Sequence, residues 1–490
     1  MEHSQPFFVT IESPTWLLYV SLLLVAVFFR FSRWLSVRNL DLTLLLTLST
    51  ALVISATETK HADLEAAGFG DASAKVAPAG EAAAEEGAEA VEERRGAHWS
   101  TIAVMALSIL VILRLTFDES LTRRPRLEQN LNQAGLTFLF LPAFSILMTG
   151  VFLKDPPPRN MDAVEAGRAL LQRQESISSD AHADQTPPPA TETLLAAAAA
   201  KVSELSGQAE QVRPSADRQT SPTEQFIARV LVVIAHAAVV VGLLYIGRRH
   251  FCSMQLGVSM SCLYLLLPCT AYNVHELSHV VPAACLTWAF ANYRKPAIAG
   301  VLLGLACGTL FFAAFLLPLW AVFYGKKGSV RFGLSLGAVA AVVLITFALT
   351  SENTDSFVNK LVMTANWTAY RLFDAAEPMP SGHIGQVFLR ITLAAFFFVM
   401  LVAMTVIPRK RNLENLLANS TALIVAAQLW YPEDVGTYVL WYLPLLLLVV
   451  FRPRLDRFVP PESPASQRSA RQPDEKSQPA GSLSRVTLYS

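Results

Sequence analysis

Residues 297–324 read AIAGVLLGLACGTLFFAAFLLPLWAVFY, an apolar stretch that contains no charged residue. It belongs to a series of apolar runs, most of them roughly 15 to 25 residues long, which is the length that a helix needs to cross the hydrocarbon core of a bilayer. Of the 490 residues, 53% are hydrophobic and only 16% are charged, whereas a soluble domain has about a quarter of its residues charged. The sequence therefore predicts an all-α fold, a polytopic bundle of transmembrane helices.

Apolar runs of this kind occur along most of the chain. They cover residues 16–29, 40–56, 99–113, 136–153, 226–246, 254–272, 280–293, 297–324, 332–349, 388–407, 413–430 and 438–451. Short loops rich in Lys and Arg face the cytoplasm. Such loops contain the groups Arg30, Arg33 and Arg38; Arg114, Arg123, Arg124 and Arg126; Arg248 and Arg249; Arg294 and Lys295; Lys326 and Lys327; Arg409 to Arg411; and Arg452, Arg454 and Arg457.

The alternation of basic and non-basic loops predicts how many times residues 297–324 cross the membrane. If this stretch crossed once, Lys326 and Lys327 would lie outside, so we expect it to cross twice as a broken or re-entrant pair of short helices. Pro318 and the glycines at 300, 304 and 308 agree with that expectation, since small residues let helices approach closely. The result is a multi-pass protein of the cell membrane with about 13 crossings, its N-terminus outside and its C-terminus in the cytoplasm.

The segments between the runs complete the expected organisation. The formal net charge of zero, with basic residues divided among many loops, argues against a nucleic-acid partner. Two loops and the tail have low complexity and too few large apolar residues for a core, so disorder or loose surface helix is expected there. The segments are a two-span hairpin (1–56), an acidic Ala/Glu-rich outer loop (57–98), a second hairpin (99–153), a Pro/Ala-rich disordered outer loop (154–225), a transmembrane core (226–350), an outer loop (351–387), the C-terminal spans (388–458) and a disordered cytoplasmic tail (459–490).

The densest polar cluster between two spans is the outer turn 272–279. Within it, His275-Glu276-Leu277-Ser278-His279 matches H-E-x-x-H, in which two histidines on one helix face bind zinc and the glutamate activates a water. Pro282 disfavours a helix running unbroken through the motif, so the helix is expected to start near Pro282, and no third ligand is evident. An intramembrane zinc metalloprotease that uses His275 and His279 is therefore one hypothesis, and a non-metal polar site is another.

The same region carries an ordered series of features. It contains Leu267-Pro268, the polar turn Asn273 to Glu276, a short span, Arg294-Lys295-Pro296, the glycines 300 to 308, Leu317-Pro318 and Lys326-Lys327. In the order of these features, the segment Leu265 to Gly328 resembles the polyprenol-phosphate-dependent glycosyltransferases of GT-C architecture, especially the GT87 mannosyltransferase-like group. The resemblance implies a lipid-phosphate sugar donor that enters from the bilayer and a transfer on the outer face, without a metal cofactor.

That resemblance also implies site residues. A carboxylate base must take a proton from the acceptor hydroxyl, and the family's base is usually an aspartate in an early outer loop. Asp63 is the best positional match, and Glu276 is the alternative. Substrate contacts are expected from the outer turn and from the loop 351–387, where cations suit a phosphate and aromatic faces suit sugar rings. These residues are His275, His279, Lys360, Trp367, Tyr370 and Arg371.

A third hypothesis comes from a different class of protein, a non-catalytic transporter or membrane scaffold. Transporters place ionisable groups near the bilayer midplane, and the chief ionisable residue inside a span is His236. A lone membrane histidine more often forms a hydrogen bond between helices. The membrane glycosyltransferase remains the leading hypothesis, with membrane lipids and a lipid-linked sugar as its partners.

Overall fold

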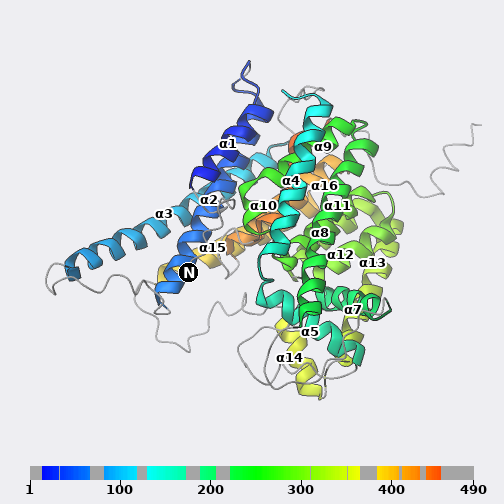
Figure 1. The fold of residues 1–490 in the computed structure, drawn as a ribbon. Coiled ribbons are helices and arrows are strands. Elements are labelled where there is room, and N and C mark those ends of the chain that lie inside the picture. Colours follow the sequence, from blue (N-terminus) through cyan, green and yellow to red (C-terminus); the bar gives the residue numbers. More distant parts are fainter. Residues whose placement is uncertain are drawn as a thin grey trace, which may run out of the picture.

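The structure is a computed structural model (Figure 1). It describes residues 14–32, 34–66, 82–118, 130–172, 188–205, 221–309, 311–349, 351, 353–364, 383–407, 411–430 and 438–453. Helices make up 87% of the structure, and the described residues form no strand. The predicted all-α class is confirmed.

The helices follow one another with short connections in the central part of the chain. They are α1 (Pro14–Phe28), α2 (Val37–Ala66), α3 (Ala82–Thr116), α4 (Gln133–Leu153), α5 (Pro158–Gln172), α7 (Ala190–Leu205), α8 (Pro222–Arg249), α9 (Met254–Leu266), α10 (Pro268–Tyr272), α11 (Leu277–Ala291), α12 (Pro296–Cys307), the 3-10 helix η2 (Phe311–Leu316), α13 (Leu317–Leu349), α14 (Thr354–Thr364), α15 (His383–Val406), α16 (Leu413–Trp430) and α17 (Val439–Phe451).

Each predicted apolar run falls on one or more of these helices. Within the described residues, five segments are long and apolar enough to cross a membrane by length and composition: Val37–Glu58, Trp99–Thr116, Gln133–Leu153, Pro222–Arg249 and Phe312–Leu349. A membrane-embedded helical bundle is therefore supported, whereas the count of about 13 crossings and the orientation of the termini stay predictions.

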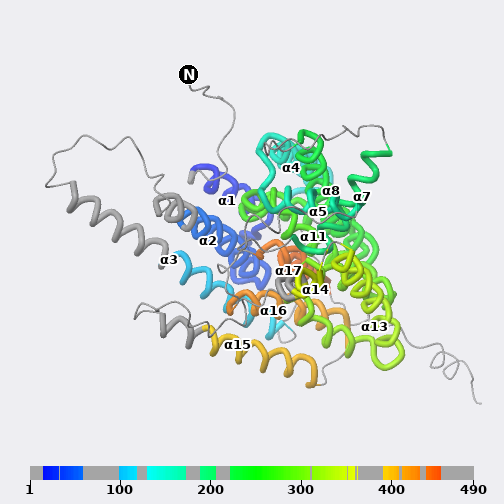
Figure 2. Tube along the Cα trace, turned by 90° about the horizontal axis from the view of Figure 1, so that it is seen from below, coloured from blue at the N-terminus to red at the C-terminus, as the bar shows by residue number. Residues whose placement is uncertain are grey.

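The two C-terminal helices form the centre of the bundle. Every residue of α17, and every residue of α16 except Glu414, is buried. A helix that is apolar all round belongs inside a bundle, and α17 is such a helix. Figure 2 shows α17 surrounded by helices from earlier parts of the chain. The last helices of the chain therefore hold the earlier ones together.

The expected break within residues 297–324 is present. Helix α12 ends at Cys307, the 3-10 helix η2 starts at Phe311, and the helical path is broken again at Gly325, where φ is +65°. Gly300 lies against Phe332 and Ser335, and Gly304 lies against Leu336 and Val339. The contacts advance in the same direction on both helices, so α12 runs parallel to the later part of α13. The chain from Thr309 to Tyr324 must therefore run back between them.

The basic loops gather at one end of the bundle, as the predicted alternation requires. The guanidinium of Arg38 lies over the ring of Phe451 at the end of α17 (5.8 Å), the ring of His250 after α8 bonds to the carbonyl of Ala291 at the end of α11 (2.9 Å), and Arg411 lies beside Gly325. Figure 1 shows α5, α7 and α14 at the other end. The molecule thus has two chemically different ends.

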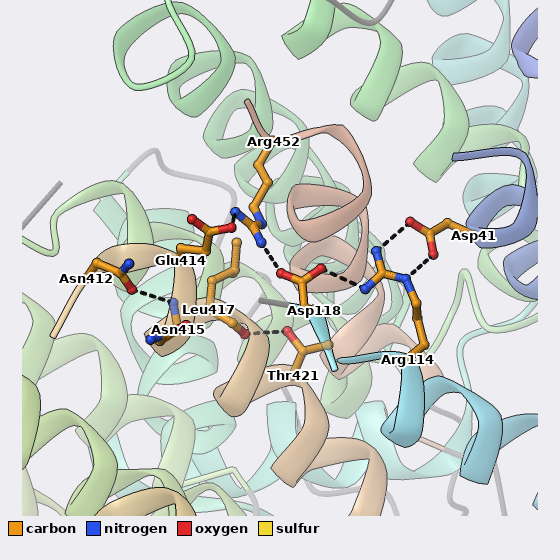
Figure 3. A network of polar contacts seen from close by, with 9 residues as sticks. All are labelled: Asp41, Arg114, Asp118, Asn412, Glu414, Asn415, Leu417, Thr421 and Arg452. Carbon is orange, nitrogen blue, oxygen red and sulfur yellow. Dashed lines mark hydrogen bonds and ion pairs between the residues drawn. The ribbon is translucent and has the colours of Figure 1, made fainter. Parts of the chain in front are cut away.

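A chain of buried ion pairs joins four helices at the basic end (Figure 3). Arg114 of α3 donates from Nε and Nη2 to both carboxylate oxygens of Asp41 in α2, at 2.5 and 2.8 Å, and from Nη1 to Asp118 at 2.7 Å. Arg452, at the end of α17, pairs with Asp118 and with Glu414 of α16. The side chain of Arg452 is fully buried. Because each charge is paired, this ion-pair chain can exist inside an apolar bundle.

Two helices lie where disorder was expected. Within the outer loop 154–225, α5 and α7 each bury one face, and α7 packs against α5 and α8. A Cβ atom at Gly167 would lie 2.6 Å from the backbone of Ala197, so α5 and α7 approach closely through small residues. The expectation of disorder is wrong for these two helices, because small side chains form a core here without large apolar ones. The tail 459–490 lies outside the described residues.

The close packing of α12 on α13 gives a first prediction. A Cβ atom at Gly300 would lie 2.5 Å from the carbonyl oxygen of Phe332, whereas Gly333 has no atom within 4 Å of its own Cβ position. We expect Gly300→Ala to lower the free energy of unfolding by about 1–3 kcal/mol through overpacking. Gly333→Ala, the matched control, should leave it unchanged or raise it by up to about 1 kcal/mol. Thermal unfolding in detergent measures both, and equal stabilities would refute the close approach.

The ion-pair chain gives a second prediction. Asp118→Asn removes the charge that lies between Arg114 and Arg452, which leaves a buried guanidinium poorly compensated, so we expect a loss of about 3–5 kcal/mol. The control is Lys201→Gln, which breaks the exposed pair of Lys201 and Glu204 on α7 (2.9 Å) and should cost less than about 1 kcal/mol. Thermal unfolding in nanodiscs compares the two variants, and an unchanged midpoint for Asp118→Asn would show that the chain of ion pairs contributes nothing.

Candidate functional site

The candidate site lies at the end of the bundle away from the ion-pair chain, around the turn between α10 and α11. Helices α5 and α7 pack over this turn. The site combines ionisable residues from five parts of the chain, and we call this group the outer polar cluster. Its members are Lys154 after α4, Arg159 on α5, Glu192 on α7, Arg229 on α8, and His275 and Glu276 in the turn.

The turn itself is fixed by Asn160 of α5, which is 1% exposed. Its Nδ2 donates to the carbonyl oxygen of His275 (2.7 Å), and its Oδ1 accepts from the backbone N–H of Leu277 (3.3 Å). One amide side chain therefore holds the backbone on both sides of Glu276. The Glu276 carboxylate consequently starts from a rigid backbone position.

His236 supports the same turn from inside the bundle. Its Nε2 lies 3.1 Å from the carbonyl oxygen of Val274, and its Nδ1 lies 3.1 Å from the hydroxyl of Tyr264. A carbonyl oxygen only accepts, so Nε2 carries the proton and Nδ1 accepts from Tyr264. His236 acts as the expected hydrogen-bond partner between helices.

Helix α11 begins earlier than expected. It starts at Leu277, with Glu276 at the N-cap position, and Pro282 lies inside it. The prediction of a start near Pro282 is wrong, because the proline lies early in the helix and its neighbours Val280 and Val281 are buried in the bundle, where packing outweighs one lost hydrogen bond.

The H-E-x-x-H motif does not lie on one helix. His275 precedes α11, whereas His279 is inside it, so the two imidazoles do not share the helical face that zinc-binding motifs of this type need. No group of three or more His, Cys, Asp or Glu side chains suited to a metal occurs among the described residues. We therefore do not identify His275 or His279 as ligands. The His279 ring instead lies against Tyr438, with 5.4 Å between the centroids.

The electrostatics of the outer polar cluster are mixed. Burial and the cations Lys154 and Arg229 lower the pKa of His275 to about 4, so this imidazole is neutral at physiological pH. Burial raises the pKa of Glu276, and the positive charge of Arg159 acts against that rise. Arg229 donates to the carbonyl oxygen of Lys154 (3.1 Å) and lies 3.4 Å from the carboxylate of Asp155. Cations thus act on both His275 and Glu276, the two neighbouring residues of the turn.

Glu192 is the residue of this cluster that sequence reasoning missed. It is 1% exposed, and burial followed by the charge of Glu276 raises its pKa to about 8, with Arg159 acting in the opposite direction. The sequence did contain a signal for its helix. Three prolines at 187–189 precede it, and Glu192 stands in the first turn, which is typical of a helix start.

The other predicted site residues have different outcomes. Asp63 lies near the end of α2 (Val37–Ala66). The side chain of Asp63 is outside the described part, so its role as the base stays a prediction. The side chain of Lys360 on α14, and all of Trp367, Tyr370 and Arg371, also lie outside the described residues.

Comparison with known proteins adds no identification. No protein-family model matches the chain, and no curated protein matches it. The functional argument therefore rests on the outer polar cluster.

The two hydrogen bonds of Asn160 give a third prediction. Asn160→Ala leaves the carbonyl of His275 and the N–H of Leu277 without this partner, so we expect a loss of about 1–3 kcal/mol in stability. The control is Asn273→Ala, since Asn273 is partly exposed and donates only to Cys269 of its own helix (3.1 Å). Thermal unfolding separates them, and an equal effect of both variants would contradict a special role for Asn160.

Proposed function

We propose that this protein is an integral membrane glycosyltransferase that moves a sugar from a polyprenyl-phosphate donor to an acceptor hydroxyl at the end of the bundle that carries α5 and α7. The observation that carries the proposal is the position of Glu276, which is close enough to Arg159 to feel its charge and directly follows His275, on which the charges of Lys154 and Arg229 act. A carboxylate base and cations for a leaving phosphate are the two requirements of this reaction. The GT-C-like order of features in residues 265–328 agrees with it.

The apolar surface beside the cluster suits a lipid-linked donor. Phe152 at the end of α4 is 42% exposed and Phe226 of α8 is 53% exposed, with 6.4 Å between their ring centroids. Lys154 follows this part of α4 by two residues, and Arg229 follows Phe226 by one helical turn. A donor could place its isoprenoid chain along the exposed faces of α4 and α8 and its phosphate against these two cations.

Each residue then has a defined role. Glu276 takes the proton of the acceptor hydroxyl while the acceptor oxygen forms a bond to the anomeric carbon. The bond between that carbon and the phosphate oxygen breaks, and its electron pair leaves with the polyprenyl phosphate. Lys154 and Arg229 stabilise the charge on the departing phosphate. Lys360, Trp367, Tyr370 and Arg371 remain predicted contributors to substrate binding, and Asp63 remains the second candidate for the base.

The other two hypotheses gain no specific support. An intramembrane metalloprotease needs His275 and His279 on one helix face, and α11 starts between them. A transporter would place ionisable groups in a midplane site, and both ring nitrogens of His236 are already bonded within the bundle. The outer polar cluster is thus the better place to look for activity.

The proposal gives a fourth prediction, tested by sugar transfer from radiolabelled polyprenyl-phosphate sugars in proteoliposomes. Glu276→Gln should reduce kcat by about 10²–10⁴-fold, the typical contribution of a general base. Arg229→Gln should lower kcat and raise KM for the donor, since it removes a cation that binds the phosphate and stabilises its charge as it departs. Glu204→Gln, on the exposed end of α7, should have no effect.

Asp63→Asn belongs in the same assay, because it distinguishes the two candidate bases. Loss of transfer only in Asp63→Asn would assign the base to α2. Full transfer in both Glu276→Gln and Asp63→Asn would remove the proposed mechanism.

A further inference from the structure

The side chain of Glu192 is held in a buried position by its neighbours in the chain. The backbone N–H of Thr191 donates to the carbonyl oxygen of Gly308 (3.2 Å), and the Thr191 hydroxyl donates to the carbonyl oxygen of Leu305 (2.7 Å). These bonds anchor the first turn of α7 to the end of α12. Glu192 therefore has no path into solvent unless α7 moves.

The carboxyl group of Glu192 is not fully hydrogen bonded. Its Oε1 is buried and has no hydrogen-bond partner among the described residues. An ionised carboxylate in such a position loses its hydration without compensation, which is costly. A protonated carboxyl group at the same place avoids most of that cost.

The charges around Glu192 also favour its protonated form. Glu276 in the α10–α11 turn disfavours a second negative charge, and the one cation that acts on Glu192 is Arg159 of α5, whose side chain is exposed. On α8, Glu224 is paired with Arg168 of α5. Helix α11 contributes the imidazole of His279 and the thiol of Cys285, and α12 contributes the thiol of Cys307. Helix α12 has no charged residue, and α13 has none outside 326–331.

We propose that Glu192 and Glu276 form a carboxyl pair that carries one proton, with the proton on Glu192 and the negative charge on Glu276. Two neighbouring carboxylates do not ionise together readily when one of them is buried. Glu192 is 1% exposed, whereas Glu276 is half-buried and so is the better site for the negative charge. Assigning Glu276 as the base rests on the proposed function, whereas the pair itself does not. Glu192 acts through Glu276 and is a positioning residue, and its own proton takes no part in the transfer of the sugar.

The pair is tested directly by infrared spectroscopy of the full-length protein in nanodiscs. At pH 6, the difference spectrum between wild type and Glu192→Gln should contain the C=O stretch of one protonated carboxylic acid. Glu204→Gln, a change on the exposed end of the same helix, should leave that band in place. Absence of the band in wild type would overturn the proposal.

Coupling between the two carboxyl groups is measured by titrating this band. Since burial and Glu276 together raise the pKa of Glu192 to about 8, the band should disappear near that pH in wild type. In Glu276→Gln the neighbouring negative charge is gone, so the midpoint should fall by about one pH unit. An unchanged midpoint would overturn the pair, even if Glu192 alone is protonated.

The stability of the protein supplies a second readout, which is the fifth prediction. The pKa of Glu192 is higher in the folded state than its ordinary value of 4.5, so the folded state binds this proton more tightly than the unfolded state. The stabilisation by the bound proton is complete below about 4.5 and is lost as the pH rises through about 8. Wild type should therefore lose thermal stability over this range, and Glu192→Gln should lose less. Parallel curves for the two proteins would contradict the proposal.

The sugar-transfer assay separates failure of the pair from failure of the proposed function. Glu192→Gln keeps a neutral group next to Glu276 and should retain transfer, with activity that persists to higher pH than in wild type. An intact band with the expected shift, together with no sugar transfer under any condition, would leave the pair in place and refute the glycosyltransferase. Sugar transfer by a protein that lacks this infrared band would refute the carboxyl pair and leave the glycosyltransferase in place.

Discussion

The chain of ion pairs from Asp41 through Arg114, Asp118 and Arg452 to Glu414 is the interaction on which the arrangement of the helices depends. A charge inside an apolar bundle is tolerated only when a partner of opposite sign is within hydrogen-bond distance. Each of these five side chains is therefore a constraint on the position of another helix. Together they fix α2, α3, α16 and α17 at one end, and so tie the beginning of the chain to its last helix.

The opposite end of the bundle differs in how its charged groups are paired. At the basic end every carboxylate of the ion-pair chain is paired with a guanidinium, so these charges are compensated within the protein. The outer polar cluster instead contains a buried carboxyl oxygen of Glu192 that has no hydrogen-bond partner within the described part of the chain. Incomplete pairing costs stability, and a folded protein retains it more readily where a ligand or a proton completes the site. This contrast is why we place function at the end with α5 and α7.

The success of sequence reasoning differed with the type of signal. The apolar runs, the broken stretch 297–324 and the structural role of His236 follow from hydropathy and from the positions of Lys and Arg, and these are local patterns. The core between α5 and α7 has no such pattern, because it is made by Gly167 facing Ala196 and Ala197, residues that also occur in disordered segments. The pairing of Asp118 with Arg452 joins residues 334 positions apart, which no periodicity reveals. Glu192 was missed because no local pattern predicts the packing of α7 against α5, and this packing buries the Glu192 side chain.

The broken apolar stretch of residues 297–324 also explains why Glu192 is buried. Helix α12 has 12 residues and so rises only about 18 Å, much less than the thickness of the hydrocarbon core. Helix α12 stops at Gly308, and the first turn of α7 packs against this end through the hydrogen bonds of Thr191. A longer, unbroken helix through residues 297–324 would fill this space and hold α7 at the surface, where Glu192 would be an ordinary ionised side chain. The early end of α12 thus couples the packing of the bundle to the protonation of its candidate site.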